Sequence, residues 1–459
     1  MTVGPDYEKP EIQLPDAWTA SIQQDNQSAI TGSQHWWRKF HDPTLNRLIA
    51  ISRQANPNIR IARARIAESW HQRSVLAAAW YPHSDFTARD EHGLGTFDES
   101  GVQWDVGSSQ AQLVQLDAGW ELDFFGRIKR QVESANAEYE AKIEGWRDAM
   151  VFINSEVALH YIAYRTLEKR ISVAYEAKDN YTKIKDMIAQ RLQDGVANQI
   201  ELHEATARLK SSEAEIPRLQ QETIVVRNRL AALLAVSPGK MKSLLVRNQS
   251  IPTPPNSIAT GFPAELLRSR PDVRRAERKV AAQSAQIGVA TANLYPQLSL
   301  SGAITYEYLR RGVTIETLYK TIGLGPSLKW RIFHACADQH RIREQESKLT
   351  QAITLYESTI LNAVTQVENS MTRLHYNKKR LRLLQQATDE HHSAAELMIE
   401  AYQAGQVDLR RLLNAQQDYI TNKDETIATQ GRHSAHSVRL FKALGGGELP
   451  QPRKQEEAN

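Results

Sequence analysis

Two very long amphipathic segments constrain this chain more than any other feature. Between Gly126 and Gly195 there is no proline, and apolar residues recur in steps of three and four, which predicts a single helix. Such a helix would measure about 100 Å, several times the usual length. The segment from Cys336 to Gly405 has the same pattern. Helices this long cannot pack inside an ordinary globular core, so each of them needs a long partner.

The composition excludes several classes of protein. The 459 residues carry a net charge of +4, which is small for this size and does not indicate a nucleic-acid-binding surface. The single cysteine, Cys336, excludes a disulfide framework and a cysteine metal cluster. There is no run of eighteen apolar residues that would predict a transmembrane helix, and the first residues do not resemble a signal peptide. Short alternating membrane strands are not excluded by this absence.

The sequence pattern occurs twice. Asn56-Pro57-Asn58 recurs as Arg270-Pro271-Asp272, and Tyr81-Pro82 recurs as Tyr295-Pro296. Each half predicts a helix, two strands of about ten residues and two long helices joined by a turn. The predicted ranges are an extended arm (1–42), a first repeat (43–240) with strands at 84–94 and 110–123 and helices at 126–194 and 198–235, a linker (241–262), a second repeat (263–445) with strands at 297–308 and 320–333 and helices at 336–404 and 408–444, and a disordered tail (446–459).

The two predicted helix turns have matching signals. Gly195 and Gly405 stand where a helix ends in a left-handed cap. Asn198 and Asp408 follow three residues later and can each cap the next helix. Pro217 lies inside the helix after the first turn and is expected to kink it.

The predicted strands alternate in polarity. In 112–122, 298–308 and 322–332 the even positions are mostly apolar and the odd positions mostly polar or small. About ten residues suffice for a tilted strand to cross a bilayer, and membrane barrels place aromatic residues at the interfaces. The candidate membrane-interface aromatics are Trp80, Tyr81, Trp120, Phe124, Phe125, Tyr295, Trp330 and Phe333. Four strands cannot close a barrel and open edges are not tolerated in lipid, so membrane-spanning strands would require several copies of the chain.

No enzyme, cofactor or metal site is predicted. His391 and His392 are adjacent, so on a helix their rings point about 100° apart and do not share an ion easily. The sequence has neither a Walker-type phosphate loop nor a Gly-x-Ser-x-Gly elbow.

Three further motifs carry a resemblance to a known family. They are the N-terminal Val3-Gly4-Pro5-Asp6-Tyr7-Glu8-Lys9-Pro10, the strand-to-helix stretch Trp120-Glu121-Leu122-Asp123-Phe124-Phe125-Gly126-Arg127, and the two helix turns. Together with the repeat they resemble the outer-membrane factor family, the TolC-like exit ducts of bacterial efflux pumps, and most closely its NodT-type lipoprotein branch. The resemblance implies a homotrimer whose twelve strands form a β-barrel in outer-membrane lipid, continuous with a twelve-helix α-barrel in the periplasm.

The resemblance also implies a function and partners. The chain would be a passive exit duct for small molecules such as drugs, toxic compounds or metal ions, without chemistry of its own. A periplasmic adaptor and an inner-membrane pump of the resistance-nodulation-division type would feed it. The turns that would dock the adaptor contain Gln193, Asp194, Gly195, Gln403, Ala404 and Gly405.

The resemblance places a periplasmic gate at the second turn. Its expected residues are Asp408, Arg410, Arg411, Asn414, Gln417 and Asp418. The family usually has Leu-Leu-Asp-Ala-Gln-Arg here, so Asn414 replaces an aspartate and Gln417 an arginine. We therefore expect a less acidic constriction, in which Arg410 or Arg411 faces the lumen and weakens cation selectivity. The alternative is that both arginines point outward, to neighbouring helices or the adaptor.

Several alternatives stay open on sequence alone. Met1 stands where the family's lipoproteins carry an acylated cysteine, which indicates either a mature form with the lipid site replaced or a start without a lipid anchor. A type I protein-secretion duct has the same architecture. A soluble coiled-coil scaffold would bury the apolar strand faces in protein instead of presenting them to lipid.

Overall fold

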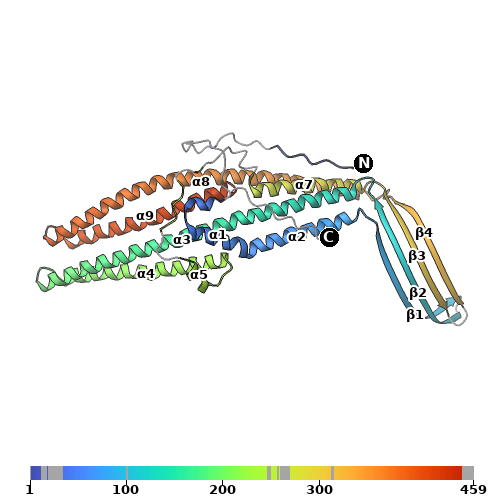
Figure 1. Ribbon diagram of the computed structural model, residues 1–459, viewed down its shortest axis with the longest axis horizontal. Coiled ribbons are helices and arrows are strands. Elements are labelled where there is room, and N and C mark those ends of the chain that lie inside the picture. Colours follow the sequence, from blue (N-terminus) through green and yellow to red (C-terminus); the bar gives the residue numbers. More distant parts are fainter. Residues whose placement is uncertain are drawn as a thin grey trace. The chain divides into compact units, whose positions relative to one another are not determined.

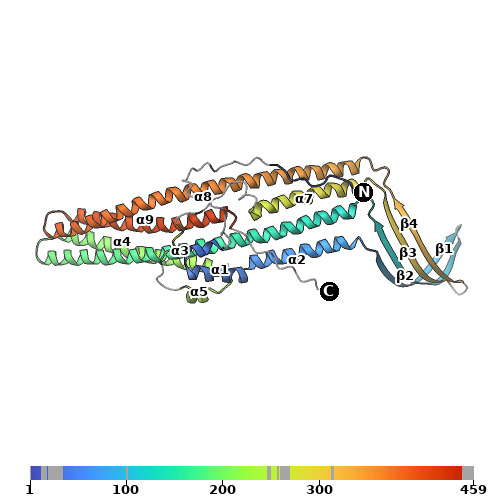
Figure 2. The same cartoon turned by 45° about the horizontal axis from the view of Figure 1, so that its top comes forward.

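The computed structural model describes residues 2–11, 18, 35–99, 102–245, 250–255, 258, 269–311 and 315–446 (Figures 1 and 2). Met1, most of the predicted arm, parts of the linker and nearly all of the predicted tail lie outside the described residues. The chain divides into two compact units. Unit 1 contains residues 1–11, 65–142 and 275–357, and unit 2 contains residues 12–64, 143–274 and 358–459.

The helices repeat in length between the two halves of the chain. α2 and α7 have 22 residues each, α3 and α8 have 67, and α4 and α9 have 35. The helices are η1 (Trp36–Phe40), α1 (Pro43–Ala55), α2 (Pro57–Ala78), α3 (Arg127–Gln193), α4 (Gln199–Leu233), α5 (Pro238–Leu244), α7 (Pro271–Ala292), α8 (Ala337–Gln403) and α9 (Leu409–Ala443). None of these helices combines the length and the hydropathy needed to cross a membrane.

The ends of the long helices form as their sequence signals predict. Asn198 Oδ1 accepts a hydrogen bond from the Glu201 amide at 3.0 Å, and Asp408 Oδ1 accepts one from the Arg411 amide at 2.8 Å. Gly195 and Gly405 have φ angles of 75° and 74°, the left-handed conformation that favours glycine. The predicted caps are therefore confirmed. α4 continues through Pro217 as one helix.

Unit 1 contains a four-stranded antiparallel sheet with the order β1-β2-β3-β4. The strands are β1 (His83–Glu99), β2 (Val102–Leu122), β3 (Gln297–Arg311) and β4 (Ile315–Lys329). With 15 to 21 residues they are longer than the expected ten or so. The expectation was too short because the alternation ends before the pairing does. Asp90 pairs with Gln112, and Arg310 pairs with Glu316, so both faces are polar there.

The register gives the sheet one apolar face. Phe86, Leu116, Ile304 and Ile322 are paired partners across the four strands and form one apolar row. The next row, on the opposite face, is polar and contains Thr87, Gln115, Thr305 and Thr321. Ile322 is 81% exposed, and Phe86 and Ile304 are more than half exposed. Within the described residues nothing covers this apolar face, and β1 and β4 are edge strands.

The two strand-to-helix connections differ in backbone strain. Gly126 precedes α3 with a φ of 78°, and a Cβ there would lie 2.8 Å from the Thr2 side chain. Cys336, 210 residues later, precedes α8 with a φ of 63°, and Ala335 has a φ of 45°. Left-handed conformations cost a residue with a Cβ roughly 1 kcal/mol, so the second connection is strained where the first is not. Cys336 is a free, exposed thiol.

Candidate functional site

Aromatic residues collect in unit 1 where the helices meet the strands. Trp120 Nε1 donates a hydrogen bond to the Trp80 carbonyl at 2.9 Å, and Trp330 Nε1 donates one to the Leu294 carbonyl at 3.1 Å. The two tryptophans occupy equivalent positions in the two halves of the chain. The Phe125 ring stacks on Tyr295 with 4.6 Å between centroids. We call the eight predicted aromatics the aromatic collar: Trp80, Tyr81, Trp120, Phe124, Phe125, Tyr295, Trp330 and Phe333.

The collar lies at one end of the sheet. Tyr81 precedes β1 and Tyr295 precedes β3, whereas Phe124 follows β2 and Phe333 follows β4. Because neighbouring strands are antiparallel, these four strand termini lie at the same end of the sheet. Trp80, Tyr81, Phe124, Trp330 and Phe333 are all exposed. The collar is therefore an exposed aromatic row at the end of the sheet from which the helices continue.

The N-terminal segment 2–11, which we call the strap, is bound across unit 1. The Val3 amide donates to the Phe125 carbonyl at 3.2 Å. The Arg130 side chain, only 3% exposed, donates to the Val3 carbonyl at 3.2 Å, to the Gly4 carbonyl at 3.2 Å and to Asp6 Oδ1 at 2.7 Å. A Cβ on Gly4 would lie 2.3 Å from Gly288 Cα. The N-terminal motif thus serves as a fitted strap beside the aromatic collar.

The second part of the strap is held by α7. Lys9 Nζ lies 2.7 Å from Glu277 Oε2, and the Arg278 guanidinium lies 5.5 Å from the centroid of the Tyr7 ring. Burial, together with the nearby Glu277 carboxylate, raises the pKa of Tyr7 to about 12. The Tyr7 hydroxyl therefore stays protonated at physiological pH.

The helix turns of unit 2 are joined by Arg191, which the sequence analysis did not single out. Arg191 comes from the last turn of α3, and its Nη1 donates to the Gln403 carbonyl at 3.2 Å and, more weakly, to the Tyr402 carbonyl at 3.4 Å. Its guanidinium also lies 5.0 Å from the centroid of the Tyr402 ring. The guanidinium donates to carbonyls at the end of α8 that have no partner within the helix, and its positive charge is favourable at the negative end of the helix dipole. A basic residue in a last helical turn is the signal that could have indicated it.

Further side-chain contacts join the α8–α9 hairpin to α3. Tyr181 Oη donates to Gln417 Oε1 at 3.1 Å. Arg170 binds Asp424 through two hydrogen bonds of 2.8 Å. Burial alone would lower the pKa of Lys423, but the Glu176 carboxylate, 2.6 Å away, raises it. A motion that separates the α8–α9 hairpin from the α3–α4 hairpin must break these contacts.

The predicted gate residues differ in their surroundings. Arg410 is 81% exposed and lies 3.5 Å from Glu204 on α4. The Gln417 side chain is already bound, because it accepts from Tyr181 and donates to Thr421 at 2.9 Å. Asp408 caps α9, and its remaining predicted neighbours Arg411, Asn414 and Asp418 are exposed.

The predicted docking turns are exposed at all six positions, from Gln193 to Gly195 and from Gln403 to Gly405. Two exposed apolar side chains, Val196 and Ile200, stand next to the first turn and were not predicted. An apolar side chain at an exposed turn offers a contact for a partner, whereas polar residues around it keep the turn soluble.

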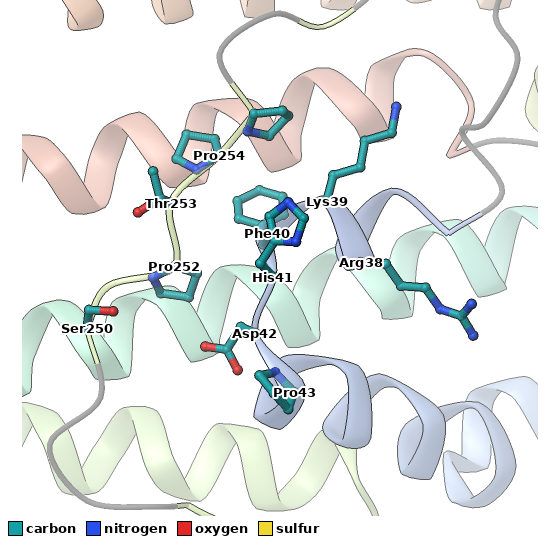
Figure 3. Close-up of a pocket in the computed structure, with 11 residues that line it drawn as sticks. Arg38, Lys39, Phe40, His41, Asp42, Pro43, Ser250, Pro252, Thr253 and Pro254 are labelled. Atoms are coloured by element: carbon teal, nitrogen blue, oxygen red, sulfur yellow. The ribbon is translucent and has the colours of Figure 1, made fainter.

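A cavity of about 860 Å³ lies elsewhere in unit 2, between residues 38–43 and 250–255 (Figure 3). Its carboxylate, Asp42, is already occupied, because it accepts from the Leu45 amide at 2.9 Å and from Tyr161 Oη at 2.8 Å. None of the predicted site residues lines this cavity. Among the described residues, no cluster of three or more potential ligands could hold a metal ion. His392 stacks on Tyr419 instead, with 4.7 Å between centroids.

The chain combines a sheet with one exposed apolar face, an aromatic collar and long paired helices. The chain belongs to the outer membrane efflux protein family, whose signature matches residues 48–236 and 262–446, and this confirms the resemblance. It is 28% identical to Nodulation protein T of Rhizobium leguminosarum bv. viciae, covering 100% of this chain and 93% of that protein. It is 27% identical to Outer membrane protein OprJ of Pseudomonas aeruginosa, covering 97% and 93%. The solved outer-membrane channel OprN matches with a TM-score of 0.86 and 30% identity, over 97% of this chain and 99% of that one.

Proposed function

We propose that the protein is the outer-membrane exit duct of an efflux system, open to passive passage of small molecules. The observation that carries the proposal is the uncovered apolar face of the β1–β4 sheet, bordered by the aromatic collar. Apolar rows such as Leu116, Ile304 and Ile322 are stable in water only when they are covered, whereas in lipid they need no cover. The opposite, polar face would line an aqueous bore.

A homotrimer resolves the unpaired edges of the sheet. The free edges of β1 and β4 would leave backbone hydrogen-bonding groups unsatisfied in lipid, where no water replaces them. Pairing β1 of one copy with β4 of the next closes a ring, and about eight strands are the practical minimum for a barrel. Three copies give a twelve-stranded barrel, and their long helices give a twelve-helix tunnel. In this proposal each of the two predicted repeats contributes two strands to the barrel and two long helices to the tunnel, and the arm and the linker lie outside both.

We further propose that the barrel lies in the outer membrane and the helices in the periplasm. The strap supports this arrangement, because Thr2 lies against Gly126 beside the aromatic collar. An acyl group carried by the residue at position 1 would therefore reach the membrane interface. The native chain is proposed to carry such a lipid anchor in addition to its barrel.

The proposed cargo and partners follow the family. Among the relatives are Cation efflux system protein CusC and Pyoverdine export outer membrane protein OpmQ, whose names indicate small cargo. We propose the same class here in preference to type I secretion of proteins. A periplasmic adaptor would dock on the exposed turns at Gly195 and Gly405, with Val196 and Ile200 as apolar contacts. An inner-membrane pump, of the resistance-nodulation-division type, would supply the energy.

The duct is tested by the size and conductance of the purified particle. We expect a detergent-solubilised trimer, measured by light scattering with correction for bound detergent, that gives discrete single-channel currents in planar bilayers. A monomer or dimer that stays in solution without detergent would refute the duct and favour the soluble scaffold. A trimer that gives no current at any voltage would also contradict the proposal.

We propose that the gate is held shut by the contacts between the α8–α9 hairpin and α3–α4. Asn414 and Asp418 are exposed four residues apart on α9 and so share one face, with Arg411 beside them, and we propose that this face lines the bore. Arg410 is directed toward Glu204 instead. This makes Arg411 the arginine that would reduce the acidity of the constriction. Arg191 would serve as the latch, because it holds the end of α8 to the end of α3.

Replacing Arg191 with serine should raise the single-channel conductance or open probability about tenfold. The substitution removes the hydrogen bonds to the α8 carbonyls and the contact with Tyr402, so the turns can separate. Lys185→Ser is the matched control, since Lys185 also lies on α3 but pairs only with its neighbour Asp186 among the described residues. If Arg191→Ser trimers conduct like wild type, Arg191 is not a latch.

A further inference from the structure

One face of α9 in unit 2 is covered by segments that are remote in the sequence. Trp36 of η1 stacks on Phe441 with 5.4 Å between centroids, and Ser434 Oγ donates to the Pro252 carbonyl at 2.7 Å. Ser434 and Phe441 are seven residues apart, about two full turns, so they share one face. In a duct, η1, α1 and the segment 250–255 cannot fill the bore. The face of Ser434 and Phe441 is therefore the outer face.

The opposite face of α9 carries arginines. Arg432 lies nine residues before Phe441, about two and a half turns, and so points the other way. His436 and Arg439 follow at spacings of four and three residues and share this face. Arg432 is partly exposed and Arg439 is exposed. The sides of α9 contact α3 and α8, since a Cβ on Gly431 would meet Thr166 and Leu440 packs with Val367 and Met371.

α8 has the same arrangement where it lies beside α9 (Figures 1 and 2). Met371 belongs to a buried cluster shared with Leu440 of α9, and Trp18 and Ile258 pack against this cluster, so the Met371 side of α8 is the covered side. Arg380 lies nine residues after Met371 and so on the opposite side, and Arg373 is seven residues before Arg380. Arg380 Nη2 lies 2.9 Å from Glu425, as does Arg432 Nη2. The two helices thus present one shared face.

We call Arg373, Arg380, Arg432, His436 and Arg439 the arginine face. Glu425 is its only ion-paired carboxylate among the described residues, and Arg373 and Arg439 form no ion pair there. Glu156 attracts Arg439 but has its own partner, Lys442, at 3.6 Å. No acidic residue occurs in 369–388 or 426–443, whereas residues 389–425 hold eight acidic and three basic residues. The positive charge is therefore concentrated in one band of the hairpin.

The cations of the arginine face lie close enough to shift one another's pKa values. Burial lowers the pKa of His436 to about 4, and the neighbouring Arg439 and Arg373 contribute to this. Burial and Arg373 also lower the pKa of Arg439. His436 is therefore neutral at physiological pH, and its Nδ1 lies 3.2 Å from Arg439 Nη1. Four arginines against one glutamate leave three positive charges per chain.

We propose that the arginine face lines the bore and forms a binding ring for anionic cargo, namely small organic molecules with carboxylate or phosphate groups. The inference rests on the proposed trimeric duct, in which threefold symmetry gathers nine positive charges around one axis. Guanidinium groups bind carboxylates and phosphates with paired hydrogen bonds, and rings of arginine attract anions into pores. Arg373 and Arg439 are the arginines without an ion pair among the described residues and so the ones proposed to bind cargo, because Arg380 and Arg432 are already paired with Glu425.

A thiol reporter on the arginine face tests its electrostatic potential without requiring an open gate. In a Cys336→Ser background, Tyr376→Cys would place a thiol between Arg373 and Arg380, at a position that is 65% exposed. Each rate is taken relative to that of the same reagent with a small free thiol, because the cationic reagent reacts intrinsically faster with a thiolate. On this scale we expect a sulfonate-bearing methanethiosulfonate to react at least tenfold faster than a trimethylammonium-bearing one at low salt. Tripolyphosphate should slow the sulfonate reaction. Arg373→Ser with Arg439→Ser should bring the ratio near one, while the control pair Lys378→Ser with Arg382→Ser, on the outer side of α8, should preserve it.

Current block separates this inference from the duct itself. On conducting trimers, tripolyphosphate should block the current, and the Arg373→Ser/Arg439→Ser pair should raise the blocking concentration at least tenfold. A conducting trimer that tripolyphosphate does not block, or a thiol ratio unchanged by that pair, would overturn the anionic-cargo inference and leave the duct standing. A particle that is not a trimer or never conducts refutes the duct, and with it the inference, whatever the thiol ratio.

Discussion

Replacing Asp42 with alanine should lower the free energy of unfolding by about 3 kcal/mol. Asp42 is buried and has two roles, because Oδ1 caps α1 at the Leu45 amide and Oδ2 accepts from the Tyr161 hydroxyl. Loss of a cap costs about 1 kcal/mol, and loss of the buried hydrogen bond from the Tyr161 hydroxyl to a charged carboxylate costs roughly a further 1.5–3 kcal/mol. Tyr161 also binds Arg165, whose side chain is fully buried, so the change would disturb a buried cation. Thermal unfolding in detergent, followed by circular dichroism, measures the effect.

Asn198→Ala is the matched control for this prediction. Asn198 caps α4 in the same way but is exposed and holds no second partner among the described residues, so its loss should cost only about 1 kcal/mol. Tyr161→Phe removes the hydroxyl but keeps the cap, so it should show the remaining part of the stability loss seen in Asp42→Ala. Equal losses for Asp42→Ala and Asn198→Ala would mean that the buried network contributes nothing beyond the cap.

Replacing Arg130 with alanine should release the strap from unit 1. Arg130 donates to two strap carbonyls and to Asp6, and hydrogen bonds to charged groups are worth about 1.5–3 kcal/mol each when buried. We expect a destabilisation of about 3 kcal/mol and cleavage by chymotrypsin after Tyr7, whose ring is packed against Arg278 in the bound strap, at least tenfold faster than in wild type. Mass spectrometry of a timed digest identifies the cleaved bond.

Arg127→Ala supplies the control for the strap. Arg127 lies one turn away and pairs with Glu121 at 2.6 Å, without a contact to the strap among the described residues. Replacing Arg127 should leave chymotrypsin cleavage after Tyr7 unchanged. Arg130→Lys should be intermediate, because an ammonium cannot reach three acceptors in the fixed geometry of a guanidinium. Wild-type cleavage rates in Arg130→Ala would show that the rest of the strap suffices to hold it.

Local features of the fold follow from the sequence because their physical causes are local. Apolar residues at steps of three and four specify a helix within a few turns, and Gly195, Asn198 and Asp408 act within four residues of their own position. Strand length was underestimated because alternation records the burial of one face, whereas backbone pairing in β1 and β2 continues where both faces are polar. The collar aromatics were identified from their positions at the ends of the predicted strands, but their gathering at one end of the sheet depends on the pairing of the strands.

The sequence by itself determined the internal repeat, the helix ends, the apolar strand faces and, through its motifs, the family. Only the tertiary structure decided which distant side chains meet. Arg130 binds a strap 124 residues away, and Arg191 binds a carbonyl 212 residues away. Whether Arg439 faces a bore or the outside likewise depends on where Trp36 packs. Such contacts leave no local pattern, because they depend on the path of the whole chain and not on the spacing of neighbouring residues.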